Sequence, residues 1–174
     1  GIFFLGKTNL SNMSSSLNGL IDIQVTRIIE SQKAAELIQL ITKREKDFLL
    51  ERDLTKKQDY LREIEKRSED MLASIEKIRG ISDDRGLQIL ENFDNNWLDY
   101  NKAFNKIKAA GLVNTDSSNA IATSISTTEA RTAALSGIRT LSQLVTKNTT
   151  ALENAKKQTD EQSHSPANIM FILL

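Results

Sequence analysis

The sequence predicts an all-α protein, an antiparallel up-down-up-down four-helix bundle with long first and last helices. Only one proline, Pro166, and seven glycines punctuate the 174 residues, fewer than strands and their turns normally need. Apolar residues recur at steps of three and four, which is the pattern of near-parallel packed helices. Three short polar breaks divide this pattern, and such short connections make successive helices antiparallel.

The first two helices are predicted over residues 8–51 and 55–79. The apolar series of the first helix is Ile21, Val25, Ile28, Ala35, Ile38 and Phe48. Polar residues interrupt this series at Gln32 and in the Thr42 to Glu45 region. The break "ERDLTKK" supplies Asp53 as an N-cap, because a carboxylate there accepts hydrogen bonds from free backbone N–H groups. The apolar series of the second helix is Leu61, Ile64, Met71, Ile75 and Ile78.

The third and fourth helices are predicted over residues 83–110 and 117–163. The third begins after the break "RGISDDRG" and carries the series Leu90, Phe93, Trp97, Tyr100, Phe104 and Ile107. Gly111 is its predicted C-terminal stop, and Asp116 or Ser117 is the predicted cap of the fourth helix. The series of the fourth helix is Leu135, Ile138, Leu141, Val145, Leu152 and Ala155, with Asn148 as a polar member.

Composition and motifs argue against several functions. The 23 basic and 23 acidic residues balance, so nucleic acid is not an expected partner. The chain has no cysteine, and its single histidine, His164, cannot form a metal cluster, so we expect neither a metal site nor a cofactor. No glycine-rich phosphate loop or Gly-x-Ser-x-Gly motif occurs. Because no acid, base or nucleophile stands in a catalytic pattern, we expect no catalytic residue and no enzyme activity.

The chain is predicted to form a single domain, residues 1–174, which begins and ends in short apolar runs. Residues 1–7, "GIFFLGK", and 167–174, "ANIMFILL", are too short to cross a bilayer, which takes about 20 apolar residues. They could be packed helix ends or the remains of a signal peptide. The first and last predicted helices exceed 40 residues, about 60 Å, so both overhang the inner pair at one pole. We therefore interpret the two runs as stubs of flanking transmembrane helices.

Several segments together resemble a known family. They are "GIFFLGKTNLSNMSSSLNGL", "ITKREKDFLLERD", "LENFDNNWLDYNKAF" and "LSQLVTKNTTALENAKKQ". In their order and spacing, the chain resembles the four-helix-bundle extracytoplasmic sensor domain of bacterial methyl-accepting chemotaxis proteins. "REKDFLL" is also similar to the first helix of the longer helical bimodular sensor domains.

The resemblance implies a homodimeric receptor in the bacterial inner membrane, with this domain in the periplasm. Its partner would be a small molecule, for example an organic acid or amino acid, or a periplasmic binding protein. Binding would shift the last helix slightly relative to the first. Two alternatives remain. The same bundle could be the input domain of a sensor histidine kinase or cyclic-nucleotide signalling enzyme, or the chain could be a purely structural helical bundle.

Counting from the turns at the predicted distal pole suggests where a ligand could bind. Arg44, Tyr60, Tyr100 and Thr128 should share one layer, with Trp97, Arg131 and Thr132 about one turn below. The stretch "AIATSISTTEARTAAL" lacks large apolar residues, which would leave space and hydroxyl groups. Arginines suit a carboxylate ligand. The alternative interpretation places the two aromatic residues of the third helix in the core and both arginines in solvent.

Overall fold

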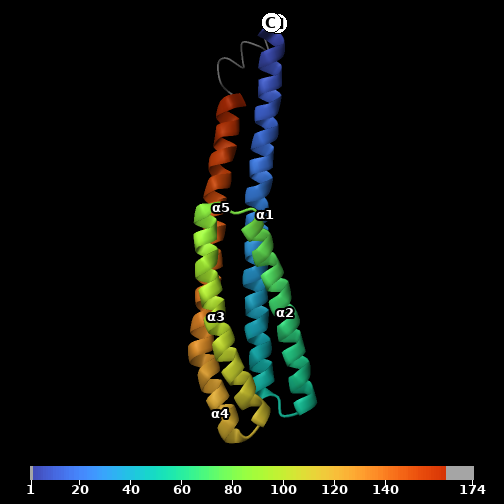
Figure 1. Cartoon of the computed structure of the whole chain (residues 1–174), viewed down its shortest axis with the longest axis vertical. Coiled ribbons are helices and arrows are strands. Elements are labelled where there is room, and N and C mark those ends of the chain that lie inside the picture. The colour runs from blue at the N-terminus through green and yellow to red at the C-terminus, as the bar shows by residue number, and fades with distance from the viewer. Residues whose placement is uncertain (1, 164–174) are drawn as a thin grey trace.

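The chain folds as an all-α, antiparallel four-helix bundle with long first and last helices (Figure 1). The computed structural model describes the backbone of residues 2–163 and the side chains of residues 12–161. The elements are α1 (Ile2–Leu50), α2 (Leu54–Gly80), α3 (Asp84–Val113), α4 (Asp116–Ile125), the π turn η1 (Ser126–Ala130) and α5 (Arg131–Ser163). The last three elements follow one another without a break and form one long rod. The predicted helices therefore agree with the observed ones to within a few residues, except at the start of α1.

The two long rods lie side by side, and the two short helices flank them. α1 packs along both α2 and α5, whereas α3 packs against α4 and α5. The beginning of α1 and the end of α5 lie at the same end of the molecule (Figure 1). Beyond the loop that joins α2 to α3, α1 and α5 continue as a pair without the other two helices. We call this pair the two-helix extension, and the opposite end, which holds the loops at 51–53 and 114–115, the hairpin end.

Caps at the helix ends explain where the chain turns. Asp53 accepts hydrogen bonds from the N–H groups of Thr55 and Lys56, and Asp83 accepts one from Gly86. The predicted cap of the last rod was wrong, because Thr115 takes this place in a reciprocal capping box with Ser118.

The predicted helix stop at Gly111 was also wrong. α3 continues to Val113, and Asn114 supplies the left-handed residue with φ 59°. Gly111 is instead a buried helical residue in contact with Phe48, so it allows close packing rather than a turn.

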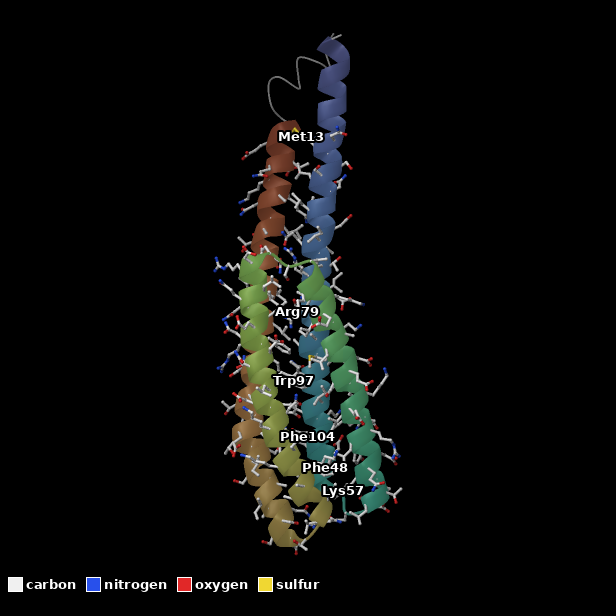
Figure 2. All side chains as sticks on the ribbon, in the orientation of Figure 1. Met13, Phe48, Lys57, Arg79, Trp97 and Phe104 are labelled. Atoms are coloured by element: carbon white, nitrogen blue, oxygen red, sulfur yellow. The ribbon has the colours of Figure 1, made fainter. Side chains whose placement is uncertain are left out.

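The core follows most of the predicted apolar series. Trp97 and Phe48 are buried between the helices (Figure 2). The predicted residues that are buried are Ile38, Phe48, Ile64, Met71, Ile75, Ile78, Leu90, Phe93, Trp97, Tyr100, Ile107 and Leu141. Val25 and Leu135 are exposed, against the prediction. Val25 lies where only two helices pack, and Leu135 lies at the wall of a pocket.

The buried Arg27 is hydrogen-bonded to the α2–α3 loop and to α5, so it connects this loop to both long rods. Arg27 of α1 donates to the carbonyl of Ile81 at 2.6 Å and to Asn148 Oδ1 of α5 at 3.4 Å. Asn148, which is fully buried, donates in turn to the carbonyl of Leu144. Lys147 also reaches the loop through a 2.6 Å ion pair with Asp83. These contacts mark the level at which the four-helix bundle gives way to the two-helix extension.

No helix in the described part of the chain combines the length and the apolar character that crossing a bilayer requires. The predicted transmembrane stub at 167–174 lies outside the described residues. Of the stub at 1–7, only the helical backbone of residues 2–7 is described. Both stubs therefore stay predictions.

Candidate functional site

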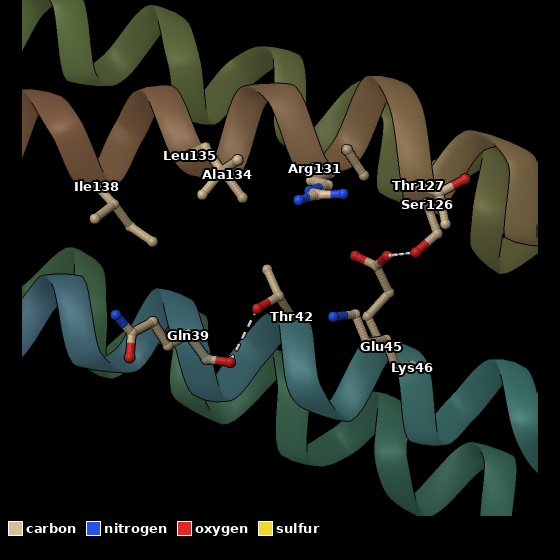
Figure 3. Close-up of a pocket in the computed structure, with 11 residues that line it drawn as sticks. Gln39, Thr42, Glu45, Lys46, Ser126, Thr127, Arg131, Ala134, Leu135 and Ile138 are labelled. Carbon is tan, nitrogen blue, oxygen red and sulfur yellow. Dashed lines mark hydrogen bonds between the residues drawn. The ribbon is translucent and has the colours of Figure 1, made fainter.

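The candidate site is a pocket of about 400 Å³ between α1 and the rod formed by α4, η1 and α5 (Figure 3). It lies in the half of the bundle nearer the hairpin end. α1 contributes four of the lining residues and the rod contributes seven. The residues are Gln39, Thr42, Glu45, Lys46, Ser126, Thr127, Ala130, Arg131, Ala134, Leu135 and Ile138. The pocket thus lies between the two helices that form the extension.

Glu45 is the buried ionisable group of this pocket. Only 2% of the residue is exposed, and both carboxylate oxygens accept hydrogen bonds. The Tyr100 hydroxyl of α3 donates to Oε2 at 2.6 Å, and the Ser126 hydroxyl donates to Oε1. Among the described residues, no lysine or arginine lies within 4 Å of this carboxylate. The carboxylate is therefore solvated by hydroxyl groups and forms no ion pair, and the charge that acts on its pKa is that of the more distant Lys46.

Burial raises the pKa values of both Glu45 and Tyr100. Burial raises the pKa of the Glu45 carboxyl, and the hydrogen bonds from Ser126 and Tyr100 oppose this only in part. The pKa of the Tyr100 hydroxyl is raised well above its ordinary value, by burial first and by the neighbouring Glu45 carboxylate second. Tyr100 therefore stays a neutral donor. A cationic group that entered the pocket would find an uncompensated acceptor at Glu45.

Cationic and apolar groups complete the pocket. Lys46 and Arg131 are exposed and line it from α1 and α5 respectively. In Figure 3 the Arg131 guanidinium lies on the α5 side of the pocket. Ala130, Ala134 and Ile138 supply an apolar wall. The site therefore combines one buried acceptor with two cations at its rim, an arrangement that suits a small ligand carrying charges of both signs.

The π turn that carries Ser126 is supported by its own side chains. The backbone N–H of Arg131 bonds to the carbonyl of Ser126, which lies five residues earlier in the chain. In an α-helix the acceptor would lie four residues earlier. The Thr127 hydroxyl donates to the carbonyl of Thr123 at 2.9 Å, and the Thr128 hydroxyl donates to that of Ser124 at 2.6 Å. Threonines suit such a turn because their hydroxyls can bond to carbonyl groups one turn back.

Two of the seven predicted ligand residues take part in this site. Arg131 lines the pocket, and Tyr100 lies behind Glu45 and holds it. Trp97 is buried in the core, stacked on Tyr100 with ring centroids 4.7 Å apart. These three residues reach the same region from α3 and α5.

The other four predicted residues lie elsewhere. Arg44 points to the opposite side of α1, where it pairs with Asp47 and Glu63, each at 2.7 Å. Its guanidinium lies 5.7 Å from the centroid of the Tyr60 ring. Thr128 and Thr132 are exposed rather than turned to the interior. Equal height in the bundle therefore did not bring these side chains together, because they face different directions around it.

Sequence reasoning missed Glu45 and Ser126. The signal for Glu45 was present, since the Thr42 to Glu45 region interrupts the apolar series of α1 at a core position. A charged residue at such a position is rarely buried without a partner. Ser126 carried no comparable signal, because it is one of many small polar residues in that stretch.

A second groove, of about 580 Å³, runs along the looser contact between α2 and α3. It is lined in part by Leu61, Tyr100 and Phe104. Its ionisable lining groups other than Tyr100, such as Arg62, Glu65 and Lys108, are exposed. We therefore take the first pocket as the candidate site. Over the described part of the chain, no three or more His, Asp or Glu side chains are grouped to hold a metal ion.

The fold and the site together define an all-α bundle with a pocket between its two long rods, and this pocket has both polar and apolar walls. Comparisons with protein-family models, curated proteins and solved structures found no match. Any assignment of function must therefore come from the geometry of this chain.

Proposed function

We propose that this chain is the ligand-sensing domain of a transmembrane chemotaxis receptor, and that the pocket at Glu45 binds the ligand. The observation that carries the proposal is the position of the pocket, between the two rods that continue together past the bundle. In this proposal the domain is extracytoplasmic, at the bacterial inner membrane, and acts as a homodimer. A ligand binds directly or is delivered by a periplasmic binding protein.

The lining favours an amino acid over a dicarboxylic acid. The ammonium group of an amino acid would pair with Glu45, which forms no ion pair although Lys46 lines the same pocket. Its carboxylate would pair with Arg131 or Lys46 at the rim, and its side chain would lie on the apolar wall at Ala134 and Ile138. A dicarboxylate would place a second negative charge near Glu45, which costs energy in a buried site. The volume lies within the range of small-molecule pockets.

A ligand in this position would join α1 to the other long rod. It can change their relative position only if it binds one arrangement more tightly than another. Coupling of 1–3 kcal/mol is typical of such systems. The arrangement that fits the ligand would be passed along the continuous helices to the two-helix extension.

The direct test is a binding screen on the purified chain. Thermal unfolding is measured with panels of amino acids, dicarboxylic acids and purines, and positive compounds are confirmed by calorimetry. A compound at 100 times its dissociation constant should stabilise the fold by about 2.7 kcal/mol. Arg131→Gln and Glu45→Gln should each weaken binding at least about tenfold, since each removes a charged contact.

Arg44→Gln is the matched control, because Arg44 lies on the far side of α1 and pairs with Glu63. This variant should bind normally. If every panel leaves the unfolding temperature unchanged, the purely structural bundle becomes the better account. The input domain of a sensor kinase or cyclic-nucleotide enzyme would use the same pocket, so it shares these expected results and differs only in the cytoplasmic output.

A further inference from the structure

The π turn η1 contains one residue more than an α-helical turn would. Its defining bond runs from the N–H of Arg131 to the carbonyl of Ser126, so five residues separate donor and acceptor instead of four. Such turns are rare and are frequently found at functional sites. The turn also starts at Ser126, the residue that donates to Glu45.

The buried face of the rod continues on both sides of the π turn. Before the turn, the buried positions Asn119, Ala122 and Ser126 advance by three and then four. From the end of the turn onward, the buried residues are Ala130, Ala133, Ala134, Gly137, Thr140, Leu141, Leu144 and Asn148. The π turn therefore lies within a continuous buried face, next to the residue that donates to Glu45.

The extra residue does not contribute to the core. Thr127, Thr128 and Glu129 are all exposed, and the two threonine hydroxyls bond to carbonyl groups of their own helix. Glu129 forms an exposed ion pair with Lys106. A local departure from the regular pattern without a gain in packing is expected where it serves a site.

We propose that the extra residue of the π turn is an insertion that builds the pocket: it sets Ser126 opposite Glu45, and the bundle does not need it to fold. Removing it would restore a regular α-helical rod and move Ser126 along its axis by about one rise, 1.5 Å. The hydrogen bond to Glu45 would then be lost. That the pocket binds a ligand rests on the proposed function, but the π turn and the hydrogen bond do not.

The test compares two single-residue deletions within the same rod. Deletion of Thr128 removes the extra residue, and deletion of Ser142 removes an equally exposed residue from a regular α-helical stretch. We expect the chain lacking Thr128 to unfold cooperatively at the wild-type temperature or above. The chain lacking Ser142 should unfold at a much lower temperature, because every buried residue after it is turned by about 100° away from the core.

A double-mutant cycle tests the link to Glu45 without any ligand. Ser126→Ala should lower the unfolding temperature of the wild-type chain by roughly 2–4 °C, the loss expected for one buried hydrogen bond. The same substitution should have no effect in the chain lacking Thr128, because the bond is already absent there. If a panel compound binds the wild type, its affinity should fall at least about tenfold in that chain.

Two results would overturn the proposal. One is that deletion of Thr128 is as damaging as deletion of Ser142, or prevents folding, because the π turn would then be required by the bundle. The other is that Ser126→Ala costs the same in both backgrounds. If no compound binds the wild type, the proposed function fails, whereas the deletions and the cycle still decide the role of the π turn.

Discussion

The contact between Gly111 and Phe48 depends on the absence of a side chain. A Cβ atom at Gly111 would lie 2.4 Å from Phe48 Cε1 and 2.8 Å from Cζ. Real Cβ atoms do not approach other atoms this closely, and Phe48 is fully buried, so it has little room to move. Lys57 adds a further restraint, because its buried ammonium donates to the Gly111 carbonyl at 2.8 Å and lies 4.5 Å from the Phe48 ring centroid.

We therefore predict that Gly111→Ala lowers the free energy of unfolding by about 2 kcal/mol, the cost typical of overpacking a core. Urea unfolding monitored by circular dichroism measures this change. Gly19→Ala is the control, because Gly19 is also helical but has no atom within 4 Å of its ideal Cβ. That variant should gain up to about 1 kcal/mol from helix propensity. Equal effects of the two substitutions would show that the contact is not restrictive.

Glu45 should make stability depend on pH. Its pKa is raised in the folded state above the ordinary value of 4.5. Between these two values, the folded chain binds a proton at this site that the unfolded chain has released. Stability from this group is therefore fully present below the ordinary pKa and is lost as pH rises through the folded-state pKa.

We predict that Glu45→Gln raises the unfolding temperature relative to wild type more at pH 8 than at pH 4, because below the ordinary pKa the wild-type chain has its full stability from this group. Thermal unfolding across this pH range measures the difference between the two chains. The exposed residue Glu65 offers the matched control Glu65→Gln, which makes the same substitution at a carboxyl group that is not buried. A difference that stays constant with pH would contradict the assignment.

At the scale of the elements, the Arg27 contacts hold the α2–α3 loop against both long rods. The guanidinium is buried and bonds to a carbonyl group and an amide oxygen, so its removal takes this donor from the buried Asn148 oxygen and from the Ile81 carbonyl. The end of the four-helix bundle is thus defined by polar contacts as well as by the lengths of α2 and α3.

We predict that Arg27→Met destabilises the chain by about 2 kcal/mol, in the range measured for hydrogen bonds to charged groups. Amide hydrogen exchange should also accelerate at residues 81–84, where the loop is held. The exposed residue Arg139 provides the control variant Arg139→Met, for which neither effect is expected. Unchanged exchange at the loop would mean that the ion pair of Lys147 with Asp83 suffices to hold it.

At the scale of the whole molecule, the proposed signal is a displacement of α5 relative to α1. The natural chain has no cysteine, so two introduced cysteines can be spin-labelled without background. The exposed residues Thr26 and Thr146 lie on the two rods, outside the pocket lining. The exposed residues Lys56 and Lys108 offer a reference pair on α2 and α3.

We predict that the panel compound with the largest thermal shift changes the distance between labels at Thr26→Cys and Thr146→Cys by roughly 1–2 Å, a typical helix shift in switching proteins. Pulsed electron spin resonance measures this distance. Labels at Lys56→Cys and Lys108→Cys should not move. Tight binding with no change in either pair would leave a binding domain but refute the transmission of a signal through the rods.

Local chemistry made most of the fold predictable. Asp53 caps its helix as expected, because a side-chain oxygen beside free N–H groups acts within three residues. The apolar series of α3 is buried from Leu90 to Ile107, apart from the partly exposed Phe104, since helical periodicity alone places these residues on one face. The resemblance to a sensor-domain family stays a prediction, because no comparison tests it.

The site was only partly predictable. It depends on the direction in which each side chain points around the bundle axis as well as on the height of the residue along that axis. Arg44 and Glu45 are neighbours in sequence, yet Arg44 faces α2 and Glu45 faces Tyr100 and Ser126. Which side of α1 meets α5 follows from how all the helices pack together. A single helix pattern does not contain this information.

The sequence by itself determined the four rods, their lengths, their antiparallel order and most of the buried face of each, because these depend on contacts between residues close along the chain. Only the tertiary structure decided that Gly111 packs on Phe48, that Glu45 is buried without an ion pair, and that Ser126 at the start of a π turn donates to it. These features join residues at least 55 positions apart in sequence, Glu45 and Tyr100 for example. The distances between these residues are fixed only when the helices pack against one another.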